Sequence, residues 1–226
     1  MFMKKFMWAF LGLGISLSAA SQSISIGPTA TIGNSWLSTD RDLSSGFDNK
    51  ELHVAYSKGM KMIVSFVPHW GMSSDISFSS EGGTFSNGNE DVKHVYRVNY
   101  IRHSTQGVYF FGQLGDRIRP RLSAGPSVAV FAGGKTKIKN GSNEGTQESA
   151  SKNLFKTWDF GIATSAGVNF KLVKNLWLNA DANYYHGLLD VNDISDNDIM
   201  NRRLGFTIGL LFGCDFKKED FKNMHK

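Results

Sequence analysis

The chain has 226 residues, enough for one domain of ordinary size, with 24 glycines, 4 prolines and 12% aromatic residues. No apolar run in its body approaches the roughly 20 residues that a membrane-spanning helix needs, which excludes a helical membrane bundle. The single cysteine excludes an internal disulfide, and no cysteine–histidine spacing indicates structural zinc. The net charge of +5 comes without a basic cluster interleaved with aromatics, which excludes nucleic acid as a partner.

Residues 1–21 are predicted to be a secretory signal peptide. Lys4 and Lys5 precede an apolar stretch from Phe6 to Leu17, and small residues follow at 18–21. This order is typical of an export signal that is cleaved after its small residues. An anchor helix is the alternative, but about 12 apolar residues are too few to cross a bilayer comfortably.

From Ser23 onward, apolar and polar residues alternate with a period of two, which predicts strands with two chemically different faces. The segment 203–216 shows this best, because its even positions are apolar and Leu211 alone breaks the pattern. Similar segments lie at 24–32, 60–66, 70–78, 121–130, 159–170 and 176–185, and a less regular one runs from about Val92 to Gly112. The predicted number of strands is therefore eight.

The predicted connections alternate in length. They are short at 67–69, 113–118 and 171–175, and long at 34–51, 80–91, 132–154 and 187–202. Tight turns at one end and long loops at the other are typical of an outer-membrane barrel whose turns lie in the periplasm. The sequence therefore predicts an all-β, eight-stranded antiparallel up-and-down transmembrane barrel over 22–216, with a short periplasmic tail at 217–226.

Alternation alone does not decide which face is inside, because a soluble lipocalin-like carrier of apolar ligands also alternates. Eight strands leave an interior only just wide enough for side chains, so the glycine-rich and serine-rich face suits the inside and the bulky apolar face suits lipid. Aromatic residues gather toward both strand ends, as interfacial girdles do. These predicted girdle residues are Phe66, Trp70, Phe110, Phe170 and Phe216 at the turn end, and Phe78, Tyr96, Phe160 and Tyr184 at the loop end.

Charged residues on the glycine-rich face are predicted to point into the barrel. They carry both signs, and an unpaired buried charge would cost several kcal/mol, so we expect a hydrogen-bonded network that fills the lumen and leaves no wide pore. The predicted network consists of Lys61, Asp75, Arg97, Arg121, Asp159, Asp181 and Arg203.

Four short segments carry a resemblance to a known family. They are Tyr96–Ile101, Arg119–Pro126, Trp158–Gly161 and Asn183–Leu188, and the Arg-Pro and Ala-Gly-Pro pairs of the second are the most specific. Over roughly 24–216 the chain resembles the PorT-like outer-membrane β-barrel family, which is common in Bacteroidetes. The resemblance implies an eight-stranded barrel without a catalytic motif. Such a resemblance is a better guide to the fold than to the function.

The chain departs from that family after the tyrosine-rich segment. The family usually has an apolar run there, whereas this chain has the polar residues 102–107. The predicted register directs Arg102, Ser104 and Gln106 toward lipid, where an arginine at mid-membrane would cost about 2–4 kcal/mol. We therefore expect a bulge in this strand, or an extension of it beyond the bilayer.

His103 with Ser104 or Thr105 gives the one hint of an enzyme, because a few eight-stranded outer-membrane barrels deacylate lipid A with a histidine and a serine on the lipid-facing wall. A hydroxyl nucleophile also needs a base and an orienting group, and the sequence offers no matching acidic partner. We expect no catalytic residue and no enzymatic activity. A lipid A-modifying hydrolase that uses His103 and Ser104 is an alternative.

Two polar segments are candidates for binding. The stretch 190–198 alternates carboxylate and amide oxygens, which calcium prefers, but it lacks the glycine and terminal glutamate of an EF-hand loop, so we expect no metal and no cofactor. The loop 133–153 carries Lys135, Lys137 and Lys139, which would suit lipopolysaccharide phosphates.

The function predicted from the sequence is that of a non-enzymatic outer-membrane barrel, exported through its signal peptide. It would serve as a membrane scaffold or surface-binding element whose long loops engage lipopolysaccharide or a protein partner. A role in a secretion apparatus, as in PorT, is one version of this function.

Overall fold

The computed structural model describes residues 23–39, 49–51, 53–86, 92–113, 115–140, 143–150, 155–191 and 199–215. The predicted signal peptide, the tail at 217–226 and Phe216 lie outside these residues. The strands are β1 (Ser23–Thr39), β2 (Asn49–Glu51), β3 (His53–Ser65), β4 (Trp70–Ser86), β5 (Val92–Phe110), β6 (Ile118–Asn140), β7 (Asn143–Ala150), β8 (Trp158–Val173), β9 (Leu176–Asp190) and β10 (Ile199–Asp215). The described residues contain no helix long and apolar enough to span a membrane.

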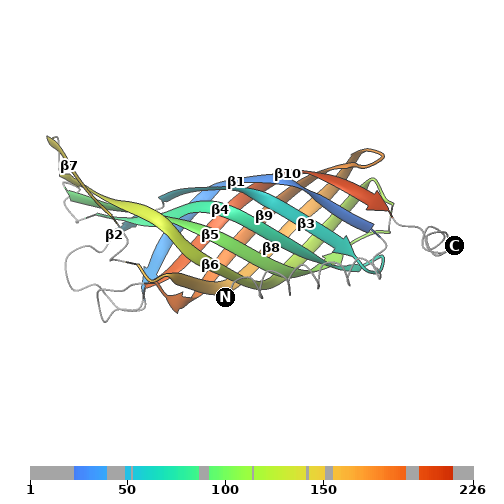
Figure 1. Ribbon diagram of the computed structural model, residues 1–226, viewed down its shortest axis with the longest axis horizontal. Coiled ribbons are helices and arrows are strands. Elements are labelled where there is room, and N and C mark those ends of the chain that lie inside the picture. The colour runs from blue at the N-terminus through green and yellow to red at the C-terminus, as the bar shows by residue number, and fades with distance from the viewer. Residues whose placement is uncertain are drawn as a thin grey trace, which may run out of the picture.

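Eight strands close into an antiparallel barrel in the order β4-β3-β1-β10-β9-β8-β6-β5, and pairing of β4 with β5 completes the circle (Figure 1). The first and last strands of the barrel pair along their whole length, from Ser23 opposite Asp215 to Thr39 opposite Ile199. The two short strands lie outside the circle, where β2 pairs with the end of β4 and β7 with the end of β6. The predicted eight-stranded antiparallel barrel is confirmed.

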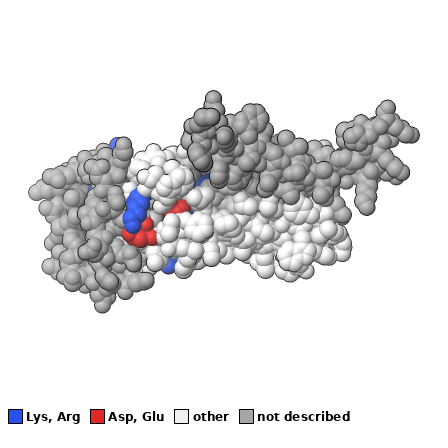
Figure 2. Space-filling model, turned by 60° about the horizontal axis from the view of Figure 1, so that its bottom comes forward, with Lys and Arg blue, Asp and Glu red and all other residues white. Residues whose placement is uncertain are grey.

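The two faces of the strands differ as the alternation predicts. In β10 the odd positions from 205 to 213 are buried, whereas Leu204, Phe206 and Phe212 are exposed by 48–61%. Other bulky apolar residues cover the outer wall in the same way, among them Ile32, Met60, Ile76, Ile101, Leu122 and Ile162. In the view of Figure 2 the described wall is mostly uncharged, and the visible charged side chains gather toward one end.

The turns and the long connections lie at opposite ends of the barrel, as Figure 1 shows. The turn end holds the connections 66–69, 111–117 and 174–175, and the loop end holds β2 and β7. Gly112 lies in the middle turn with a φ of 95°, a conformation that favours glycine. β5 and β6 are the longest strands, with 19 and 23 residues.

The register of β5 differs by one residue from the prediction. Val98, Tyr100 and Arg102 are buried, so the even positions point inward and the odd positions outward. Shifting a strand by one residue moves each side chain to the other face. Arg102 and Gln106 therefore face the lumen rather than lipid, and no bulge in β5 is needed to accommodate them.

The same shift corrects three predicted positions, all of them in β5. Arg97, expected in the lumen, is exposed on the outer face. Phe110 and Tyr96, expected in the girdles, point inward, where Phe110 is fully buried and Tyr96 packs against an interior cluster. The prediction failed because both faces of this strand mix polar and apolar residues, so the alternation does not identify the inner one.

The other predicted girdle residues within the described part of the chain lie in β4, β8, β9 and one turn. Trp70, Phe78 and Phe160 are exposed on the outer wall, and Phe66, Phe170 and Tyr184 are partly exposed. Outward aromatics that were not predicted include Trp36, Tyr56, Tyr109 and Trp158. Tyr109 packs edge-on against Trp70 at the turn end, with ring centroids 5.0 Å apart.

Candidate functional site

Charged side chains from four strands meet in the half of the lumen nearer the loop end. Arg102 of β5 donates to Glu81 of β4 through Nε and Nη2, at 3.1 and 2.8 Å. The same Nη2 donates to Asp159 of β8 at 2.9 Å, and Arg203 of β10 donates to Glu81 at 3.0 Å. Because Glu81, Asp159 and Arg102 are fully or almost fully buried, each carboxylate depends on these cations for its stability.

Neutral groups complete this upper cluster. The Tyr185 hydroxyl donates to Asp159 at 2.7 Å, and the Arg102 guanidinium lies 3.9 Å from the centre of the Tyr185 ring. Asn201 donates to both Glu81 and Asp159. The upper cluster, defined as these six residues, thus satisfies two buried carboxylates and joins five strands across the lumen.

A second cluster lies nearer the turn end. Arg121 of β6 donates through Nη2 to both oxygens of Asp181 of β9 at 2.6 Å, and Lys61 of β3 donates to the same carboxylate at 2.7 Å. The strand between β6 and β9 is β8, and Gly167 is its residue in register with Arg121 and Asp181. A Cβ at Gly167 would overlap an oxygen of Asp181, so glycine makes room for this lower cluster.

Between the clusters the lumen keeps a polar cavity of about 50 Å³. Asp75, Lys61, Arg102 and Arg203 line it together with serine and threonine side chains. This volume suits a few water molecules bound to polar groups.

Apolar side chains lie above and below the charged layers. At the loop end a buried cluster consists of Leu37, Val98, Tyr100, Ala129, Phe155 and Val191. At the turn end a second one consists of Ile63, Val108, Phe110 and Leu211, with Trp177 packed against it. Leu211, which breaks the sequence alternation, belongs to this lower apolar layer. The described residues therefore fill the lumen from end to end with four side-chain layers.

Six of the seven predicted network residues lie in this lumen, and the exception is Arg97. The sequence prediction missed Glu81, Arg102, Tyr185 and Asn201. Glu81 and Asn201 lie in segments interpreted as loops, and Arg102 lies in the strand with the shifted register. The strands extend beyond the segments in which the alternation is clear. At the strand ends the inner face carries large residues in place of small polar ones, so the two faces no longer differ in the sequence.

The structure separates the two residues of the hydrolase alternative. Ser104 points inward and donates to Ser127 at 2.8 Å, whereas His103 lies on the outer face and is hydrogen bonded through Nε2 to Ser74 Oγ at 3.0 Å. The described outer faces of β4 and β5 carry no carboxylate that would orient this histidine. The arrangement is a polar pair on the wall, and it does not favour acyl transfer.

The candidate metal segment lies mostly outside the described residues, which end at 191 and resume at 199. Among the described residues, no group of three histidine, cysteine or acidic side chains is placed to hold a metal ion.

Beyond the loop end of the barrel, β5 and β6 continue as a ribbon that β7 extends. The pairing skips Ala132, so β6 has a bulge there and the odd positions above it point outward. Arg97 then lies opposite Lys135, and Val95 opposite Lys137. Arg97 and Lys135 are both exposed, which places two cations side by side on the outer face.

Comparisons with known proteins agree with this geometry. The solved structure of the outer membrane protein OprG from Pseudomonas aeruginosa matches 87% of this chain over 98% of its own length, with 13% identity and a TM-score of 0.58. A major outer membrane protein from Thermus thermophilus matches 84% of this chain over 99% of its own, with 9% identity and a TM-score of 0.51. These two likenesses concern the fold alone.

The search of curated proteins gave no match. The family model described as an outer membrane protein beta-barrel domain matches residues 19–193, which is more than half of the chain. Together with the closed barrel and its apolar outer wall, this match makes the chain a small eight-stranded barrel of the outer membrane. The chain belongs to the outer membrane protein beta-barrel domain family.

Proposed function

We propose that this barrel is a non-enzymatic scaffold that holds the β5–β6 ribbon at the cell surface, where the basic outer face of the ribbon binds lipopolysaccharide. The observation that carries the proposal is the length of the two strands. About 9–11 tilted residues cross a bilayer, whereas β6 has 23. Leu122 of β6 pairs with Tyr109 at the turn-end interface, and the bulge at Ala132 lies roughly ten residues further along the strand. This is about the length needed to cross the bilayer, so the part of β6 after the bulge lies beyond it.

Above that level the ribbon carries its cations. Arg97 and Lys135 pair directly across the two strands, and Lys137 follows two residues later. The ribbon thereby presents several cations on one face, and a basic surface of this kind attracts anionic groups. By this count the cations lie just beyond the bilayer, where lipopolysaccharide phosphates are expected, and each basic side chain near an anionic membrane surface contributes about 1 kcal/mol to binding.

The filled lumen supports a scaffold rather than a pore. A wide channel needs a polar, water-filled interior, whereas this one is occupied by paired charges between two apolar layers. Because the clusters join strands from all sides, they also make the barrel a rigid base for the ribbon.

Binding of lipopolysaccharide by charge-neutralised variants tests the proposal. The triple variant Arg97→Gln, Lys135→Gln, Lys137→Gln should bind purified lipopolysaccharide severalfold more weakly than the wild type in detergent, and the loss should shrink at high salt. Lys174→Gln, at an exposed position in a turn of the opposite end, is the matched control. Equal binding by the triple variant and the control would refute the ribbon as the binding surface.

A narrower version of the proposal is a PorT-like role in a secretion apparatus, with a protein partner at the loops. The segments Arg119–Pro126 and Asn183–Leu188 support it. Deleting the gene that encodes this chain should then leave secreted proteins inside the cell envelope. Normal secretion in the deletion strain would remove this version and leave the scaffold proposal standing.

A further inference from the structure

A pocket of about 770 Å³ lies at the loop end of the barrel, where β6, the start of β8 and the end of β9 meet. This volume falls within the range of about 300–1,000 Å³ that is typical of small-molecule sites. The described residues that line it include the large apolar side chains of Phe131, Phe155, Trp158 and Leu189. The pocket therefore offers a mainly aromatic surface to a ligand.

A change of register between β8 and β9 opens the wall beside this pocket. The paired part of the two strands ends with Gly161 opposite Gly187. The two segments meet again where the Lys156 backbone N–H donates to the Val191 carbonyl, at 2.9 Å. Between these two links the β8 side has one residue more than the β9 side. The extra residue makes a bulge, a feature that is common at barrel rims and beside active sites.

The opening brings outer and inner side chains into one pocket. Trp158 and Leu189 lie on the outer face, exposed by 57% and 46%. Phe155 belongs to the buried apolar cluster at the loop end, and Phe131 packs against that cluster. The Phe131 ring also contacts Tyr100 edge-on, with ring centroids 6.3 Å apart. The inner wall of the pocket is thus held in place by the apolar layer that closes the lumen.

An ion pair lies at the rim of the pocket. Lys156 Nζ donates to the Asp190 carboxylate, which also accepts a hydrogen bond from the Ile199 backbone N–H at 2.8 Å. The Lys156 side chain is 45% exposed, and an ammonium group has three N–H donors. Lys156 can therefore donate to a second anionic group while it keeps its bond to Asp190. The rim thus favours a ligand that carries a carboxylate.

The pocket is reached from the outer surface. Phe131 directly precedes the bulge at Ala132, where β6 leaves the bilayer. We propose that the pocket binds a compact aromatic molecule with a carboxylate, whose ring packs against the aromatic side chains and whose carboxylate contacts Lys156. This site goes beyond the proposed binding of lipopolysaccharide, because it does not use the basic face of the ribbon.

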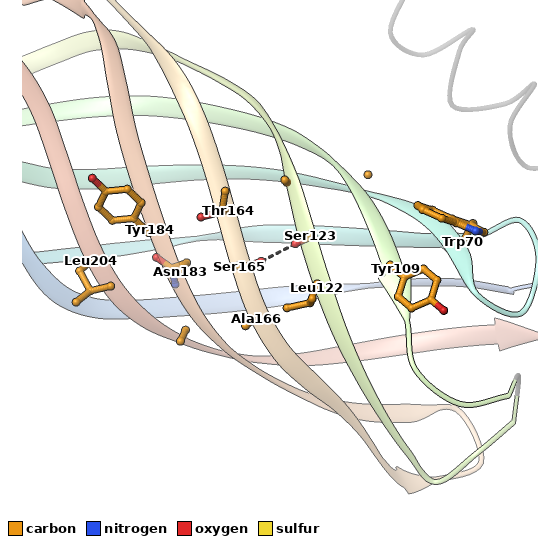
Figure 3. Close-up of a pocket in the computed structure, with 13 residues that line it drawn as sticks. Trp70, Tyr109, Leu122, Ser123, Thr164, Ser165, Ala166, Asn183, Tyr184 and Leu204 are labelled. Atoms are coloured by element: carbon orange, nitrogen blue, oxygen red, sulfur yellow. Dashed lines mark hydrogen bonds between the residues drawn. The ribbon is translucent and has the colours of Figure 1, made fainter.

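A hollow of about 610 Å³ in the middle of the outer wall provides an internal comparison. Figure 3 places Trp70, on its border, near the tight turns, and Tyr184 and Leu204 further toward the loop end. None of the described residues that line this hollow is charged. An aromatic molecule without a charge suits both places, whereas an aromatic carboxylate should prefer the pocket at the loop end.

Photo-crosslinking with benzophenone-4-carboxylate tests the proposal on the whole mature protein in lipid nanodiscs. Irradiation attaches the probe to nearby C–H bonds, and mass spectrometry identifies the labelled residues. Labels should be several-fold more frequent on residues of the loop-end pocket than on those of the hollow in Figure 3. An excess of biphenyl-4-carboxylate should suppress them. Equal labelling of both places, or labels that the competitor leaves unchanged, would overturn the proposal.

Filling the pocket supplies the control. Leu189→Trp should reduce the labelling of the pocket several-fold. Leu188→Trp is the matched control and should keep the labelling. Leu188 is 45% exposed on the same strand, and it is not among the described residues that line the pocket. Heat-modifiable gel mobility checks that each variant is folded. If both variants fold and are labelled equally, the pocket is not the binding site.

The carboxylate contact is tested with Lys156→Gln. This variant should be labelled several-fold less by benzophenone-4-carboxylate, and as strongly as the wild type by the uncharged 4-(hydroxymethyl)benzophenone. Lys174→Gln, at the opposite end, should change neither result. An equal loss with both probes, or no loss with either, would refute the contact between the carboxylate and Lys156.

Discussion

At the scale of single residues, oppositely charged side chains form ion pairs with each other in the narrow lumen of the barrel. Arg102 contacts two carboxylates at once, and Asp181 accepts from both Arg121 and Lys61. The sequence predicted Asp159, Asp181, Lys61 and Arg121 as inward because they alternate with bulky apolar neighbours. It could not predict which pairs form, since partners such as Arg102 and Asp159 lie 57 residues apart.

Removing Arg102 should strongly destabilise the barrel. In Arg102→Met, Glu81 and Asp159 stay buried and lose their shared cation, which typically costs about 3–5 kcal/mol. Urea unfolding in lipid vesicles, followed by heat-modifiable mobility, measures the loss. Lys174→Gln, on the exposed turn, should change the free energy of unfolding by less than about 0.5 kcal/mol. Equal stability of Arg102→Met and the wild type would contradict the upper cluster as described.

Gly167 and Gly107 form a matched pair on opposite faces. Gly167→Ala should cost about 1–3 kcal/mol because its methyl group meets the Asp181 carboxylate. Gly107→Ala should be nearly neutral, since the nearest atom to its new methyl is 3.9 Å away. Unfolding of both variants under the same conditions tests the difference. A larger loss of stability in Gly107→Ala than in Gly167→Ala would contradict the assignment of the inner face of the barrel.

At the scale of elements, β5 is the strand whose faces the sequence did not reveal. Its inward positions are apolar at both ends and polar in the middle, because Val98 and Phe110 belong to the apolar layers and Arg102 to the upper cluster. Simple alternation identified the inner face of β10, where glycine and threonine lie inside. It failed where the strand crosses three interior layers.

Cysteine labelling distinguishes the two registers of β5. In a Cys214→Ser background, Ile101→Cys should react with a membrane-soluble maleimide, because Ile101 is 54% exposed on the outer wall. Tyr100→Cys should remain unlabelled in the folded barrel, since Tyr100 is only 2% exposed. The opposite result, with position 100 labelled and 101 protected, would restore the register expected from the sequence.

At the scale of the whole molecule, the sequence predicted the closed barrel, the number of strands and the sorting of turns and loops. These follow from the period of two and from turn spacing, which are local signals. It did not predict the ribbon of β5 and β6 above the membrane, because residues 80–91 and 132–154 have a loop-like polar composition. Within these segments the structure describes strands at 80–86, 132–140 and 143–150, and these form by pairing between β4, β5, β6 and β7.

The central claim is that the lumen is filled by paired charges between two apolar layers. Conductance of the folded, full mature chain in planar lipid bilayers tests it most directly. We predict no steady current above the background of the bilayer, because the described residues line interior cavities of about 50 and 20 Å³, which are too small to form a wide channel. A large, steady conductance would contradict the claim and the scaffold function that depends on it.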